Sequence, residues 1–234
     1  MTASPLELTP VFRIGPVPIT EPVITTWAIM ALALFFAVLA TRKLLLKPST
    51  VQAGLELIVE AIDHQAEEVI RQDPAPFRPI VGTIFLFILI ANWSSLLPGV
   101  EPPTARLETD AALALIVLVS TGYFGIRMQG ARGYLRSFAQ PSWVMIPLNI
   151  VEQITRTFSL VVRLFGNIMS GVFVIGIVLS LAGLFVPIPL MALELLSGTV
   201  QAYIFAILAC VFIASAVGRE STDTKTTSKQ GDAQ

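Results

Sequence analysis

The sequence predicts an all-α polytopic membrane protein with about five membrane helices and one amphipathic helix at the cytoplasmic surface. Of its 234 residues, 54% are hydrophobic and only 13% are charged, and the mean hydropathy is +0.77. This composition, with apolar runs near the ~20 residues that span a bilayer, is typical of an integral membrane protein. We expect one membrane domain over residues 1–234, whose last two helices are long and form a steeply tilted hairpin.

Composition also argues against several kinds of site. The net charge is −1 and no basic patch is present, so a nucleic-acid partner is not expected. The one cysteine, Cys210, lies in an apolar run, and the one histidine, His64, lies among acidic residues without a second ligand nearby. We therefore expect no disulfide framework, no metal site and no cofactor.

Residues 1–22 are the expected external N-terminal arm. Five prolines exclude a long helix there, so an extended arm or a short hairpin is predicted. The arm lacks the basic stretch and the short apolar core of a cleaved signal peptide. Residues 23–40 form the first predicted span, which must itself direct insertion.

Residues 51–72 have the pattern of an amphipathic surface helix, with Leu55 and Ile62 on the apolar face and Glu56 and Glu60 on the acidic one. Anionic lipid repels an acidic face, so a protein partner is favoured over membrane adhesion. A solvated face without a partner is the alternative.

The second and third predicted spans are residues 80–97 and 111–126. The second carries Asn92, Ser94 and Ser95 near one end. One interpretation is that these groups line an aqueous half-channel. We favour the other, in which only Asn92 is buried and the two serines mark the membrane interface.

Basic residues predict the orientation. Eight of them follow spans one and three, whereas the opposite side holds only Arg13 and Arg106. The positive-inside rule places the N-terminus outside and the C-terminus in the cytoplasm. Residues 219–234, rich in Thr, Ser, Lys and Gln, are expected to be a disordered cytoplasmic tail.

Residues 147–217 are the predicted tilted hairpin. Its arms, 147–179 and 190–217, are ~50 and ~42 Å long as helices, against a hydrocarbon core of ~30 Å, and such a mismatch is relieved by tilting. Pro147 suits a first helical turn. The Val-Pro-Ile-Pro at 186–189 is the expected connection.

The first arm carries a polar stripe. Its members recur at steps of three and four residues, the period of one helical face, and are Glu152, Arg156, Ser159, Arg163, Asn167 and Ser170. A guanidinium stays charged in a membrane at a cost of at least ~2.5 kcal/mol, and usually faces a partner or a water-filled path. For Arg156 an ion pair with Glu152 is an equal alternative, whereas for Arg163 we favour a functional role.

The second arm repeats this pattern with Glu194, Ser197, Gly198 and Gln201. Glu194 is the only carboxylate of that arm. Together with Arg163 on the first arm it would form a polar seam.

Two motifs resemble those of a known family. Residues 159–167 read SLVVRLFGN, residues 195–205 read LLSGTVQAYIF, and both fit with FLFILIANWSSLLPG at 85–99. Over most of residues 25–217 the chain closely resembles subunit a of the rotary F-type ATP synthases.

The resemblance implies an ion-conducting stator without catalysis of its own, beside a rotating ring of c subunits. Arg163 then corresponds to the essential arginine, Asn167 to a polar helper and Gln201 to the glutamine of the facing helix, while Glu194 supplies a half-channel carboxylate. Protons or sodium ions would pass through two aqueous half-channels onto and off the c-ring carboxylates, coupled to ATP synthesis or hydrolysis. Further half-channel candidates are Asn92, Glu152, Arg156, Ser159, Ser170, Ser197 and Tyr203.

The implied partners are the c-ring, the peripheral-stalk b subunits near residues 51–72, the remaining ATP synthase subunits and the lipid of a bacterial inner membrane. The chain departs from common family patterns at three positions, Thr157, Val172 and Glu194. Two competing functions are a stand-alone ion transporter and an intramembrane enzyme. No internal repeat supports the first, and no Ser/His or paired-Asp constellation supports the second.

Overall fold

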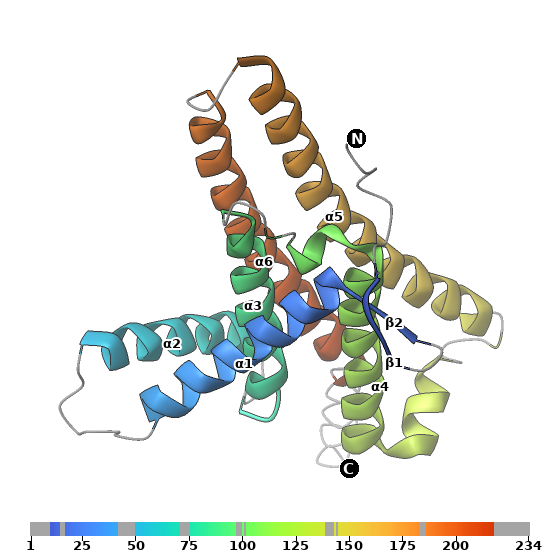
Figure 1. Ribbon diagram of the computed structural model, residues 1–234. Coiled ribbons are helices and arrows are strands. Elements are labelled where there is room, and N and C mark those ends of the chain that lie inside the picture. Colours follow the sequence, from blue (N-terminus) through green and yellow to red (C-terminus); the bar gives the residue numbers. More distant parts are fainter. Residues whose placement is uncertain are drawn as a thin grey trace, which may run out of the picture. The chain divides into compact units, whose positions relative to one another are not determined.

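The computed structural model describes residues 10–14, 17–41, 50–70, 75–96, 100, 102–138, 143, 145–182 and 186–217. Within these residues the chain forms six α-helices, two 3-10 turns and one two-stranded ribbon (Figure 1). Five of the helices contain stretches long and apolar enough to cross a membrane. The predicted polytopic all-α class is therefore confirmed. The predicted tail at 219–234 lies outside the described residues.

In the described part of the N-terminal arm, two strands pair as in the predicted hairpin. Strand β1 (Pro10–Ile14) pairs antiparallel with β2 (Val17–Thr20). Helix α1 (Glu21–Thr41) follows, and Pro22 lies in its first turn. Proline suits this position because backbone N–H groups in the first turn have no helical acceptor. The candidate span Pro22–Leu39 agrees with the predicted first span.

The predicted amphipathic helix is α2 (Thr50–Ile70), and the second span is α3 (Arg78–Trp93) followed by the 3-10 turn η1 (Ser94–Leu96). An ion pair joins α2 to the start of α3, with Arg78 Nε 2.6 Å from Asp63 Oδ1. Glu56 and Glu60 are exposed as predicted. The apolar side chain of Val59 is exposed as well.

Helix α4 (Leu107–Phe138) follows the turn η2 (Pro103–Ala105) and is much longer than the predicted span at 111–126. Arginine is a good helix former, so the basic residues that end the apolar run do not end the helix. Gly130, with φ 73° and ψ 158°, interrupts the helical geometry. That conformation is open essentially only to glycine, so the sequence allows a kink there.

The last two spans are α5 (Met145–Ala182) and α6 (Pro187–Val217). Pro147 lies in the first turn of α5, as predicted. The predicted connection at 186–189 is wrong, because Pro187 begins α6 and Pro189 lies in its first turn. Proline is well suited to these positions, where the backbone N–H groups have no helical acceptor.

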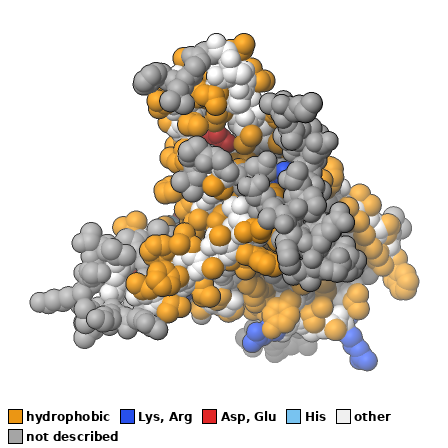
Figure 2. All heavy atoms as spheres, in the orientation of Figure 1, with side chains coloured by type: hydrophobic (Ala, Val, Ile, Leu, Met, Phe, Trp, Pro, Cys, Tyr) orange, Lys and Arg blue, Asp and Glu red, His pale blue; other side chains and the backbone are white. Residues whose placement is uncertain are grey.

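The chain forms two compact units. One comprises residues 1–56, 86–109 and 164–202, and the other comprises 57–85, 110–163 and 203–234. In the second unit α2, α3, α4 and α6 share a buried apolar cluster of Ala66, Phe77, Val81, Phe124, Ala206, Cys210, Ile213 and Val217. Hydrophobic side chains also cover much of the described surface (Figure 2), as expected for helices that contact lipid.

Candidate functional site

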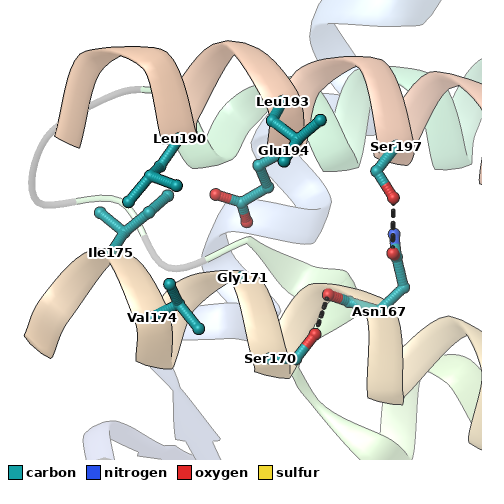
Figure 3. Close-up of a pocket in the computed structure, with 9 residues that line it drawn as sticks. All are labelled: Asn167, Ser170, Gly171, Val174, Ile175, Leu190, Leu193, Glu194 and Ser197. Atoms are coloured by element: carbon teal, nitrogen blue, oxygen red, sulfur yellow. Dashed lines mark hydrogen bonds between the residues drawn. The ribbon is translucent and has the colours of Figure 1, made fainter. Parts of the chain in front are cut away.

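A pocket of about 210 Å³ lies between α5 and α6 in the first unit (Figure 3). Its lining combines four apolar residues with four polar residues and one glycine. The lining residues are Asn167, Ser170, Gly171, Val174, Ile175, Leu190, Leu193, Glu194 and Ser197. The pocket therefore brings together Asn167, Ser170, Glu194 and Ser197 from the predicted site.

Asn167 and Ser197 connect the two helices directly. The Ser197 hydroxyl donates a hydrogen bond to Asn167 Oδ1 at 2.7 Å, while Ser170 donates to the Asn167 backbone carbonyl at 2.9 Å. Asn167 Nδ2 is buried and has no hydrogen-bond partner among the described residues. The Asn167 side chain is thus oriented by a hydrogen bond to its Oδ1 atom, while its Nδ2 group remains available to donate one.

Glu194 lies against Gly171 of the facing helix. A Cβ atom added at Gly171 would lie 2.7 Å from Glu194 Oε1, closer than non-bonded atoms approach. Glycine at this position therefore leaves the space that the carboxylate occupies. Glu194 Oε1 is buried without a partner among the described residues.

Asn92 ties three elements of the first unit together. Its Nδ2 donates to the Gly198 carbonyl of α6 at 2.9 Å, and its Oδ1 accepts a hydrogen bond from Thr104 of η2 at 2.7 Å. Asn92 is only 2% exposed, as predicted. Ser94 is also buried, so the prediction that Asn92 alone would be buried is wrong; the Ser94 hydroxyl bonds the Ala91 carbonyl within the helix end.

Gln201, one helical turn beyond Ser197 on α6, is buried, and its Nε2 has no partner in the described part of the chain. Three of the four residues predicted to move ions thus have a buried polar atom without a protein partner. Such atoms are rare in folded proteins and are usually satisfied by water or an ion. The other described residue of this kind is Asp110, in the second unit.

The second unit holds the two arginines of the predicted stripe. Of the two alternatives for Arg156, the structure has the ion pair with Glu152, and the guanidinium carbon lies 5.7 Å from the centre of the Phe212 ring. The side chain of Arg163 is exposed on α5, with no ion pair or hydrogen bond to any described residue. Arg156 is therefore neutralised locally, whereas Arg163 presents an uncompensated charge.

Two further candidates from the sequence also lie in the second unit. The Tyr203 hydroxyl donates to Gln65 Oε1 of α2 at 2.8 Å, so it joins α6 to the amphipathic helix. Ser159 is exposed on α5.

Sequence reasoning missed Thr104, Gly171 and Asp110. No local pattern marks Thr104 or Gly171, because their roles depend on contacts with other helices. Asp110 did leave a signal, since it precedes the buried residues Ala114, Val117, Thr121 and Phe124 at steps of three and four. A carboxylate on that face is expected to be buried.

The pocket presents carboxyl, amide and hydroxyl groups and is large enough to hold several water molecules. Groups of these kinds donate and accept hydrogen bonds and bind small cations through their oxygen atoms.

Comparison with known proteins gives consistent results. Residues 23–214 match the family model described as ATP synthase A chain. The chain is 60% identical over 218 residues to "ATP synthase subunit a 2" of a Bradyrhizobium species, covering 93% of this chain and 98% of that protein. It is 48% identical over 196 residues to "ATP synthase subunit a" of Albidiferax ferrireducens, covering 83% and 85% of the two chains.

Proposed function

The chain belongs to the ATP synthase subunit a family, and from that premise we propose that it is the ion-conducting stator of the rotary motor. As a member of the family it is a non-catalytic membrane subunit that works with other ATP synthase subunits. In this function, one aqueous half-channel delivers ions to the carboxylates of a c-ring and a second half-channel receives the ions that those carboxylates release. Arg163 lies between the two half-channels.

One observation carries this proposal. Buried polar atoms without a protein partner occur at Asn167, Glu194 and Gln201, in one unit and beside or near a pocket large enough for water. A purely structural polar seam would satisfy these atoms internally, as it does at Asn92. We therefore assign Glu194, Asn167, Ser197 and Gln201 to the lining of a half-channel.

Arg163 supplies the fixed charge. An exposed arginine within an apolar helix is costly unless a partner or water meets it, and no described residue of this chain does so. A carboxylate brought past Arg163 by a c subunit would be stabilised in its ionised form by the nearby guanidinium. The c-ring carboxylate then releases its ion into one half-channel, and the fixed charge blocks direct passage between the two. Each ion gains ~2.3 kcal/mol per 100 mV of membrane potential.

The other assignments follow from charge and exposure. The exposed acidic residues of α2, including Glu56 and Glu60, suit a peripheral-stalk b subunit. The excess of basic residues after spans one and three favours an N-terminus outside the membrane. Membership of the family supports a bacterial inner membrane.

The test is ATP-driven ion uptake into vesicles that hold the whole complex, with wild type beside Arg163→Ala. We expect the variant to assemble and to lose uptake. Lys225→Ala, which removes one positive charge from the predicted tail, is the matched control and should transport normally. Uptake measured with and without sodium identifies the ion. Retained uptake in Arg163→Ala would show that the polar stripe is structural.

A further inference from the structure

The C-terminal part of α4 carries three exposed arginines, Arg127, Arg132 and Arg136. The sequence contains no aspartate or glutamate between Asp110 and Glu152. Within the described residues none of the three arginines forms an ion pair; Arg127 contacts only the uncharged Tyr123, whose hydroxyl lies 3.3 Å from Arg127 Nη1. This end of α4 therefore holds three positive charges that no described carboxylate of the chain neutralises.

The position of these arginines along the helix matches a membrane boundary. Residues 107–126 precede them and, at ~1.5 Å per residue, span ~30 Å, which is the thickness of the hydrocarbon core. If α4 begins at one edge of that core, Arg127 reaches the headgroup layer on the other side. Arg132 and Arg136 follow within the next three helical turns.

The kink at Gly130 changes the direction of the chain at this depth. Figure 1 shows the end of α4 turning away from the axis of the preceding helix. Beyond the kink, Arg132 and Arg136 are four residues apart and lie on one helical face. The kink allows both guanidinium groups to lie along the membrane surface rather than further into the water.

Exposed apolar side chains accompany the arginines. Ile126 and Met128 flank Arg127, and Leu135, between Arg132 and Arg136, is 70% exposed. A surface that is both cationic and apolar matches the membrane interface, where acyl chains meet phosphate groups.

We propose that this arginine segment, Arg127 to Arg136, binds the phosphate headgroups of anionic phospholipids. Guanidinium groups bind phosphate through paired N–H donors, and a cationic helix end at the interface attracts anionic lipid. A soluble acidic protein would satisfy the charges but not the exposed Leu135 and Met128. The lipid would fix the end of α4 in the interface, independently of the ion path.

The test uses the whole complex in nanodiscs of phosphatidylcholine with increasing phosphatidylglycerol. Arg127 serves as the reporter, through its modification by phenylglyoxal, which is read by peptide mass spectrometry. In wild type the modification should fall as phosphatidylglycerol rises. Each basic residue near the surface contributes about fivefold in lipid affinity. Arg132→Gln/Arg136→Gln should therefore lower the affinity that this protection measures by about 25-fold.

Two variants control for assembly and for charge. Arg132→Lys/Arg136→Lys keeps the charge and should retain most of the protection. Lys225→Gln/Lys229→Gln removes two charges from the predicted tail and should leave protection unchanged. Equal protection in wild type and the double glutamine variant would overturn the proposal. Full protection in pure phosphatidylcholine would also overturn it, because a protein would then cover the segment. Equal protection by inorganic phosphate at matched ionic strength would overturn it as well, because the segment would then be a site for free anions.

Discussion

Helices α5 and α6 are both long and apolar, and both carry predicted site residues, yet they differ in how much of each is buried within the chain. Only 11% of the residues in the α5 span are buried within the chain, against 50% in the α6 span. Helix α6 contributes to the apolar cluster through Ala206, Cys210 and Ile213, whereas α5 leaves Arg163 and Ser159 uncovered. Helix α6 thus packs more fully within the subunit, and the exposure of α5 supports the proposal that Arg163 faces a c subunit.

The sharpest test of this difference is Arg163→Lys. If α5 presents a delocalised guanidinium to a partner carboxylate, lysine cannot replace it, since its ammonium is a compact charge with another geometry. We expect loss of ATP-driven uptake with the complex still assembled, as judged by copurification of the other subunits. Wild-type uptake in Arg163→Lys would mean that any positive charge suffices.

Glu194→Gln tests the pocket that α6 contributes. The amide keeps the shape of the side chain but lacks the carboxyl group that takes up and releases a proton. We expect uptake to slow by about 100-fold, the lower range for removal of a proton-transfer group, without the complete loss seen at Arg163. Glu108→Gln, at an exposed position near the start of α4, is the control. An unchanged rate in Glu194→Gln would make Glu194 a structural polar group.

Truncation should affect stability in α6 more than in α5. Ile213→Ala removes a fully buried side chain of the apolar cluster and should cost about 2–5 kcal/mol of folding free energy. Ile177→Ala, at a position exposed on α5, should change stability by less than about 0.5 kcal/mol. Thermal denaturation of the detergent-solubilised complex measures both. Similar shifts would contradict the conclusion that α6 packs more fully within the subunit.

Gly171→Ala tests the close approach of the two helices. The added methyl group meets the Glu194 carboxylate, and overpacking of this kind costs about 1–3 kcal/mol. We expect the carboxylate to move and uptake to fall about tenfold. Gly176→Ala, on the same helix with nothing within 4 Å of the new Cβ, should behave as wild type. Equal behaviour of the two variants would show that Glu194 has room to relocate.

Ser197→Ala should give the smallest effect. It removes one hydrogen bond to Asn167, which is worth about 0.5–1.5 kcal/mol. Uptake should fall several-fold and recover in Ser197→Thr, which keeps the hydroxyl. A deficit that persists in Ser197→Thr would point to packing rather than to orientation of Asn167.

The sequence by itself determined the features that depend on local spacing. The number of spans followed from apolar length and the stripe on α5 from its 3.6-residue period, while the separation of one turn made the Glu152–Arg156 pair one of two alternatives. The family motifs singled out Arg163, Asn167 and Gln201 as candidate site residues. All of these are readable along one helix, because neighbours three and four residues apart share a face whatever the rest of the chain does.

Only the tertiary structure decided which groups meet across helices. Asn92 bonds Gly198 from 106 positions away, Ser197 holds Asn167 from 30 positions away, and Gly171 makes room for Glu194. Sequence spacing does not specify such pairs, since they depend on the rotation and register of packed helices. The same holds for buried atoms left without a partner: a polar residue is visible in the sequence, but its burial and its unused hydrogen bond appear only once the neighbouring helices are in place.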